Sequence, residues 1–244
     1  MSGERKVEVC LTPDLIGGYP DKDSIVVIID VFRATSTICS AFANGVKSII
    51  PVAETEEARI YKEKGYLVAG ERDGIKLDFA DFGNSPENFA VEKVEGKTVA
   101  YTTTNGTGTI HTASDYYQTI IGSFLNAGAV VSYLKNSGHD VLLLCAGWKG
   151  RFNLEDTLCA GYITSLLLET GAFRTVCDSA LASVDLWKVA EPDVEAYIQK
   201  AAHRQRLRDK HLDHCITYCL SLNITDVIPV MKGDELVSLD VDVL

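Results

Sequence analysis

Acidic and basic side chains gather where apolar runs of the sequence end. In residues 142–168 a buried strand is expected to end at Cys145, and a glycine-bearing loop then leads to Arg151 and to Glu155 and Asp156 in the first turn of a helix. Loop glycines and helix N-termini bind anions, a guanidinium adds a bidentate contact, and carboxylates offer oxygens to a cation. This combination is typical of a metal-bridged phosphate, although acidic residues in a first turn also simply stabilise a helix.

Similar polar loops follow three other apolar runs. They carry Asp30 with Arg33, Glu71 with Arg72, and the group Thr104, Asn105, Gly106 and Thr107. The carboxyl ends of parallel strands meet at the ligand-binding edge of an open α/β sheet, so we expect the four loops to converge. Their side chains suit a Mg²⁺ ion that holds a phosphoryl group clamped by arginine. Taken singly, Asp30 could instead cap the helix after it, and Arg72 could be a surface charge.

Two nucleophilic mechanisms match this pattern in part. Cys145 and Arg151 have the C-x5-R spacing of cysteine-dependent phosphatases, but Leu144 stands where that class carries a histidine. Cys145 could equally be a small buried residue that ends a strand. Asp30 begins a partial match to D-x-D aspartyl phosphatases, in which Phe32 replaces the second carboxylate.

Metal and nucleotide motifs are weaker still. His211, His214, Cys215 and Cys219 have helical spacing and could suggest zinc, but a mixed face of an amphipathic helix explains them better. Residues 103–108 have neither the G-x-G-x-x-G order nor a P-loop ending, so the sequence does not support dinucleotide or ATP use.

The elements that must position these residues alternate between strand and helix. Strands are predicted over 24–29, 47–52, 66–70, 97–102, 118–122 and 140–145, with connections that favour parallel pairing. Residues 33–38 resemble residues 105–110, and 69–71 resemble 146–148, which suggests a duplicated βαβαβ unit with halves 24–74 and 97–150. Residues 171–244 are predicted to be mainly helical, with two short strands in 226–239. We predict a single α/β domain spanning 1–244.

Composition limits the partners of the chain. Its formal net charge is -11 with a pI near 4.9, so nucleic acid and anionic membranes are not expected to bind. Seven cysteines scattered through apolar runs, without a signal peptide, indicate reduced thiols and a cytoplasmic location. No apolar run approaches the roughly 20 residues of a membrane span. A homodimer is the default expectation.

The polar segments together resemble the 2-phosphosulfolactate phosphatase family. The segments that carry the resemblance, in order along most of the chain, are 30–37, 69–72, 81–86, 103–107 and 145–156. The resemblance implies a three-layer α/β/α fold with a largely parallel or mixed sheet. It also implies a Mg²⁺-dependent phosphatase that hydrolyses 2-phosphosulfolactate to sulfolactate and phosphate, a step of coenzyme M biosynthesis. In that case Asn84 and Ser85 could contact the phosphate and Asp81 could be a metal ligand.

These considerations define a predicted site. Its catalytic residues are Asp30, Arg33, Arg151 and Glu155, and its metal ligands come from Asp30, Glu71, Asp81, Glu155 and Asp156. Substrate contacts are assigned to Arg33, Arg72, Asn84, Ser85, Thr104, Asn105, Gly106, Thr107, Lys149 and Arg151. Direct attack by water is the favoured mechanism, and an aspartyl-phosphate on Asp30 is the alternative. The alternative functions are a phosphatase of a related phosphorylated hydroxy acid, or a non-catalytic binder of small phosphorylated or sulfonated acids.

Overall fold

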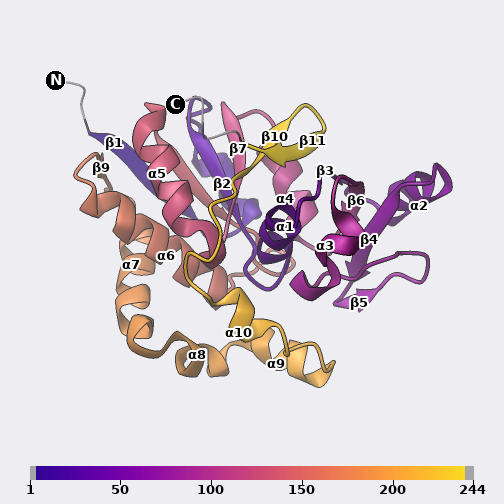
Figure 1. Ribbon diagram of the computed structural model, residues 1–244. Helices are drawn as coiled ribbons and strands as arrows, with labels where there is room; N and C mark the ends of the chain where they lie inside the picture. The colour runs from indigo at the N-terminus through magenta and orange to yellow at the C-terminus, as the bar shows by residue number, and fades with distance from the viewer. Residues whose placement is uncertain (1–3, 240–244) are drawn as a thin grey trace.

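The computed structural model describes residues 4–239, in which an 11-stranded mixed sheet lies between helices (Figure 1). The strands are β1 (Arg5–Cys10), β2 (Ile25–Ile29), β3 (Ser48–Pro51), β4 (Leu67–Arg72), β5 (Ile75–Lys76), β6 (Thr98–Thr102), β7 (Gln118–Gly122), β8 (Val141–Cys145), β9 (Phe173–Arg174), β10 (Pro229–Lys232) and β11 (Glu235–Ser238). The helices are α1 (Ala34–Ala43), α2 (Thr55–Glu63), α3 (Val91–Val94), α4 (Gly106–Thr112), α5 (Ala127–Ser137), α6 (Leu154–Glu169), α7 (Asp178–Ala190), α8 (Val194–Tyr197), α9 (Ala202–Asp209) and α10 (Ile216–Cys219).

Strand β2 shows why the molecule has three layers. All of its side chains are buried, and alternate residues point to opposite faces of the sheet. Val27 belongs to a core that includes residues of α5, α6 and α7, whereas Ile28 belongs to a second core with residues of α1 and α4. A β-branched run without polar positions therefore needs helices on both sides. The three-layer α/β/α fold predicted from the sequence is confirmed.

The strand order interleaves the two predicted halves of the chain. The order is β5-β4-β6-β3-β11-β10-β7-β2-β8-β1-β9. The first strand of the first half, β2, lies between β7 and β8, and the first strand of the second half, β6, lies between β3 and β4. The first strand of each half therefore pairs with two strands of the other half. This reciprocal arrangement is what a duplicated unit would give, and the duplication itself stays a prediction.

The hairpin formed by β10 and β11 joins the two parallel groups. It pairs antiparallel with β7 on one side and with β3 on the other, so strand direction is reversed between the groups. The sequence predicted that the polar loops would follow parallel strands along one rim of a single sheet, whereas the observed sheet reverses direction between the two groups. A twist of roughly 20–25° per strand step adds up over the steps from β2 to β6. This twist lets the carboxyl ends of the two groups approach each other beside α1 and α4, which are in contact.

The C-terminal part is mainly helical, as expected, with β9 and the hairpin as its strands. Helices α8, α9 and α10 form the lower margin of the molecule in Figure 1. Among residues 4–239, no helix is both long enough and apolar enough to cross a membrane.

Candidate active site

A small polar cavity lies where loops from both parallel groups meet α9. It is lined by Asp30, Phe32, Arg33, Glu71, Gly74, Asn84, Asn105, Trp148, His203 and Leu207. The loops after β2, β4, β6 and β8 all contribute, as the sequence predicted. The cavity therefore collects acidic, basic and amide groups from segments that are far apart in the chain.

Asp30 follows β2 directly and is a buried acid, with 7% of its surface exposed. Its Oδ1 accepts a long hydrogen bond of 3.4 Å from the backbone N–H of Ala34, at the start of α1. Burial raises the pKa of Asp30 to about 6; His203 and this N–H oppose the rise, and Glu71 and Glu155 add to it. Asp30 is thus a carboxylate whose charge the protein alone compensates poorly.

Gly106 allows α4 to begin against Asp30. A Cβ at this position would lie 2.6 Å from the Ala34 Cβ and 2.9 Å from the Asp30 Oδ2. Both distances are shorter than any side chain tolerates, so only glycine brings the starts of α1 and α4 together here. Gly106 shapes the cavity wall.

Glu71 is buried at the end of β4 and is fixed by the neighbouring loops. Its Oε1 accepts a hydrogen bond from Thr104 N at 2.8 Å, and its Oε2 accepts from Thr104 Oγ1 at 3.0 Å and Gly74 N at 2.5 Å. Thr104 Oγ1 also accepts from Asp73 N. These donors hold the Glu71 carboxylate beside Asp30, whose pKa it raises.

Amide and guanidinium groups complete this part of the wall. The Asn84 Oδ1 accepts from the Tyr101 hydroxyl at 2.5 Å, and the Asn105 Oδ1 accepts from Lys149 N at 3.1 Å, so both amides are held in place. Arg33 is buried with 4% exposure and forms no salt bridge within residues 4–239. A buried guanidinium without a carboxylate partner is suited to an anionic ligand.

Glu155 and His203 form a buried pair beside the cavity. The His203 Nδ1 lies 2.5 Å from the Glu155 Oε1, and Glu155 Oε2 has no partner among the described residues. The imidazole also packs against Phe32 and Trp148. Because one ring nitrogen is held by the carboxylate, the orientation of the ring that lines the cavity is fixed.

Asp156, a predicted metal ligand, instead ties two loops together. Its Oδ1 accepts from Val31 N at 2.9 Å and its Oδ2 accepts from Gly147 N at 3.1 Å. Burial raises the pKa of Asp156 well above its ordinary value, and Glu155 and Asp30 act in the same direction. Both oxygens are therefore used within the fold, and Asp156 does not line the cavity.

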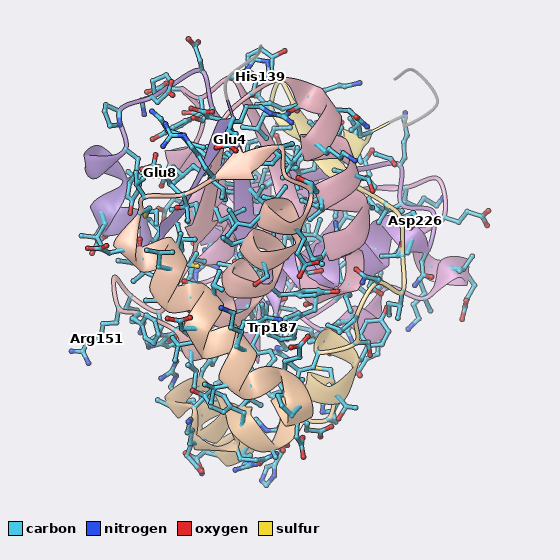
Figure 2. The ribbon with its side chains drawn as sticks, turned by 90° about the vertical axis from the view of Figure 1, so that its left-hand side faces the viewer. Glu4, Glu8, His139, Arg151, Trp187 and Asp226 are labelled. Carbon is cyan, nitrogen blue, oxygen red and sulfur yellow. The ribbon has the colours of Figure 1, made fainter. Side chains whose placement is uncertain are left out.

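Two predicted contact residues in the loop after β8, Arg151 and Lys149, lie outside the cavity. Arg151 is exposed, and Figure 2 shows its side chain directed to solvent at the margin of the molecule. Gly147 and Gly150, both with positive φ, turn this loop back on itself so that Arg151 pairs with Trp148 through the backbone. Lys149 is half-exposed and forms a salt bridge of 2.7 Å with Asp73.

Arg72 and Asp81 serve the structure around β4. Arg72 donates to the backbone oxygens of Glu71 and Ala53 and to Thr102 Oγ1. Asp81 accepts from Lys62 Nζ at 2.6 Å and from Val68 N at 2.8 Å. Asp81 therefore lies apart from Asp30 and Glu71, and the structure does not support it as a metal ligand.

Thr107 and Ser85 are buried close to the site without lining it. Thr107 exchanges hydrogen bonds with Thr103 and so fixes the turn that leads into α4. The hydroxyl of Ser85 has no hydrogen-bond partner among residues 4–239. Of the ten predicted substrate contacts, the cavity wall includes Arg33, Asn84 and Asn105.

The structure reduces the predicted donor set for a metal. Within residues 4–239, no three His, Cys, Asp or Glu side chains are grouped so that they could hold an ion. This finding also gives no support to zinc binding by His211, His214, Cys215 and Cys219, the weak zinc candidates. Asp30 and Glu71 remain on the cavity wall. Two carboxylates are enough for Mg²⁺, which keeps several waters and takes further oxygens from a phosphate.

The cysteine mechanism is disfavoured. Cys145 is fully buried in the core at the end of β8, and burial raises the pKa of its thiol well above the ordinary value. The neighbouring Asp156 acts in the same direction. A thiol in this environment stays protonated and is a poor nucleophile.

Sequence reasoning missed the contribution of α9. His203 and Leu207 line the cavity, yet neither follows a strand. The available signal was the cluster of basic residues in 203–210 within a chain of net charge -11. Trp148 lies in a loop that the sequence singled out, but its indole was not selected as a site residue.

Comparison with known proteins bears on this arrangement. A family model described as 2-phosphosulpholactate phosphatase matches residues 10–234. A protein from Clostridium botulinum (strain Eklund 17B / Type B), named "Probable 2-phosphosulfolactate phosphatase", is 37% identical over 238 residues, covering 96% of this chain and 100% of the relative. A protein of the same name from Carboxydothermus hydrogenoformans is 39% identical over 226 residues, covering 92% of each chain. The predicted resemblance is confirmed, and the chain belongs to the 2-phosphosulfolactate phosphatase family.

Proposed function

We propose that the protein hydrolyses the phosphomonoester of 2-phosphosulfolactate to sulfolactate and phosphate, with Mg²⁺ as cofactor, as a cytoplasmic step of coenzyme M biosynthesis. Membership of the family makes the protein a phosphoric monoester hydrolase. The substrate, the cofactor and the pathway are our proposal. We also propose that the enzyme is a homodimer that acts without nucleic acid or membrane partners.

Asp30 and Glu71 are the residues that would hold Mg²⁺. Both are buried on one cavity wall, where burial raises the pKa of Asp30 to about 6 and the charge of Glu71 adds to that rise. A divalent cation beside them would offset this unfavourable pairing. When bound, Mg²⁺ would polarise the phosphoryl group and offset its charge.

Arg33, Asn84 and Asn105 would bind the phosphate. The guanidinium of Arg33 is buried and forms no salt bridge in residues 4–239, so it can pair with a dianionic phosphate. The amide oxygens of Asn84 and Asn105 are held by Tyr101 and Lys149 N, which leaves their NH₂ groups for phosphate oxygens. Preorganised donors of this kind stabilise charge that develops in the transition state.

His203 would move the proton. An alkoxide is a poor leaving group, so the departing hydroxyl of sulfolactate needs a proton as the bond to phosphorus breaks. The His203 Nδ1 is held by Glu155 at 2.5 Å, which directs the other ring nitrogen away from that carboxylate. Glu155, predicted from the sequence as a catalytic residue and metal ligand, would act by orienting His203.

The observation that carries this proposal is the assembly of Asp30, Glu71 and Arg33 in one buried cavity. The direct test incubates the purified protein with 2-phosphosulfolactate and Mg²⁺ and measures phosphate release, with EDTA as the control. Release that stops with EDTA and returns with Mg²⁺ is expected. Binding without release would instead indicate a non-catalytic binder.

The same preparation tests the mechanism. Direct attack by water predicts no covalent intermediate. An aspartyl-phosphate on Asp30 predicts that acid quenching during turnover traps protein that is heavier by one phosphoryl group. Peptide mapping of the trapped species would then locate the label.

A further inference from the structure

Helix α9 closes the cavity with one face and carries an arginine on either side of that face. His203 and Leu207 are one helical turn apart and both line the cavity. Successive residues of a helix are rotated by about 100°, so Arg204 and Arg206 flank the covering face on opposite sides. A chain of net charge -11 therefore carries a cation on each side of the helix face that covers the cavity.

Arg206 lies against a residue of the cavity wall. Its guanidinium carbon is 4.5 Å from the centre of the Trp148 ring, and Trp148 lines the cavity. The Nε and Nη2 atoms are shielded from solvent and have no hydrogen-bond partner among residues 4–239. Stacking on the indole fixes the plane of the guanidinium and leaves its donor edge unused.

Arg204 shares the unpartnered donors of Arg206, without the aromatic contact, in a more buried position. Only 7% of its surface is exposed, and its Nε and Nη1 lack partners among the described residues. Arg208, on the same helix, shows the ordinary alternative: it lies 3.8 Å from Asp213, with 34% of its side chain exposed. Burying an unpaired guanidinium costs free energy, and a bound anion would offset that cost.

We propose that Arg206 and Arg204 together form a second anion site, in which each guanidinium, on its own side of the covering face, binds an acid group of the substrate other than the phosphate. The inference rests on the proposed function, because 2-phosphosulfolactate carries a sulfonate and a carboxylate beside its phosphate. In the proposed function, Arg33 and the Mg²⁺ held by Asp30 and Glu71 bind only the phosphate group. A guanidinium fork matches either remaining group, and a sulfonate stays charged across the physiological pH range. The site therefore makes the enzyme selective for phosphate esters of acids over neutral phosphate esters.

The test uses three matched esters. They are 2-phosphosulfolactate, 2-phospholactate, which lacks the sulfonate, and 2-phosphooxyethanesulfonate, which lacks the carboxylate. Wild type, Arg206→Gln and Arg204→Gln are compared with the control Arg208→Gln. Isothermal titration calorimetry in EDTA gives Kd without turnover, and phosphate release with Mg²⁺ gives kcat/KM.

Arg206→Gln is expected to weaken 2-phosphosulfolactate roughly 10- to 100-fold, the value of a charge-assisted hydrogen bond. It should leave unchanged the one ester that lacks the group bound by Arg206, which shows whether that group is the sulfonate or the carboxylate. Arg204→Gln should act in the same way, and Arg208→Gln should have no effect. If Arg204→Gln does not fold, Arg204→Lys, which keeps the charge but loses the fork, decides the role of Arg204.

Two outcomes would overturn the second anion site. Equal weakening of all three esters by Arg206→Gln would mean that Arg206 binds the phosphate or supports the fold. Unchanged binding of all three would mean that Arg206 takes no part. Wild type that binds the esters but releases no phosphate would refute the proposed function alone, since calorimetry still decides the anion site. Wild type that binds none of the esters in EDTA and releases no phosphate with Mg²⁺ would refute both.

Discussion

Replacing Asp30 with asparagine is expected to stabilise the metal-free protein at neutral pH while abolishing phosphate release. The carboxyl group is buried, and burial raises its pKa to about 6. An amide of the same shape keeps an oxygen that can accept from Ala34 N, and it carries no charge to bury. Asp30→Asn therefore removes the free-energy cost of burying a charge at this position, a cost that only a bound cation would offset in the wild type.

The size of this effect follows from the pKa. The unfolded chain should titrate near the ordinary value of 3.8 and the folded chain at about 6, so the folded state binds more protons between these values. Wild-type stability then falls as pH rises through this window, by at most roughly 3 kcal/mol at about 1.36 kcal/mol per pKa unit. Asp30→Asn avoids the loss. Its Tm should exceed that of wild type by up to roughly 6–12 °C above pH 7, and the gain should vanish near pH 4.

Differential scanning calorimetry in EDTA across this pH range measures the effect. The control is Asp73→Asn, because Asp73 is half-exposed and the hydrogen bond from Lys149 lowers its pKa, so no gain is expected. Mg²⁺ should stabilise wild type more than Asp30→Asn. A Tm gain that does not change with pH, or an Asp30→Asn protein that is less stable at pH 7.5, would refute this account of the buried charge.

Three further substitutions test the rest of the site. Arg33→Gln should lower kcat/KM by roughly 100-fold, whereas Arg151→Gln, at an exposed position, should stay close to wild type in the same phosphate-release assay. His203→Asn should lower kcat by roughly 100- to 10,000-fold and remove one limb of the pH profile, so an unchanged profile would exclude proton transfer by His203. Gly106→Ala should cost about 1–3 kcal/mol in a denaturant melt, because its methyl would meet an atom at 2.6 Å; Gly108→Ala, with nothing within 4 Å, should be neutral.

The sequence predicted site residues where apolar strands end, and this strand-end rule explains which of them the sequence could reveal. Asp30, Glu71 and Asn105 each follow an apolar run that reads clearly as a strand, and all three line the cavity. The rule depends on topology rather than on side-chain detail. It therefore succeeded although the sheet reverses direction between its two parallel groups.

The residues that the rule misplaced depend on backbone angles that the sequence does not show. In the loop after β8, Gly147 and Gly150 adopt φ of 62° and 74°, and this turn sends Arg151 to solvent. His203 was missed for another reason. Its partner Glu155 is 48 positions away, and the polar sequence of α9 gives no local sign of this contact. Helix α9 reaches the cavity through tertiary packing. Its basic composition can suggest a functional role, but composition does not predict where the helix packs.

The predicted duplication accounts for how such a site could arise. The internal match aligns Arg33 with Asn105 and Glu71 with Trp148, and all four line the same cavity. The charged member of each pair comes from the first half of the chain and the uncharged member from the second. Two identical halves that exchanged their leading strands would bring equivalent loops face to face, with equal charges opposed. Divergence of one half would remove that repulsion and leave acids and a guanidinium from the first half beside neutral side chains from the second.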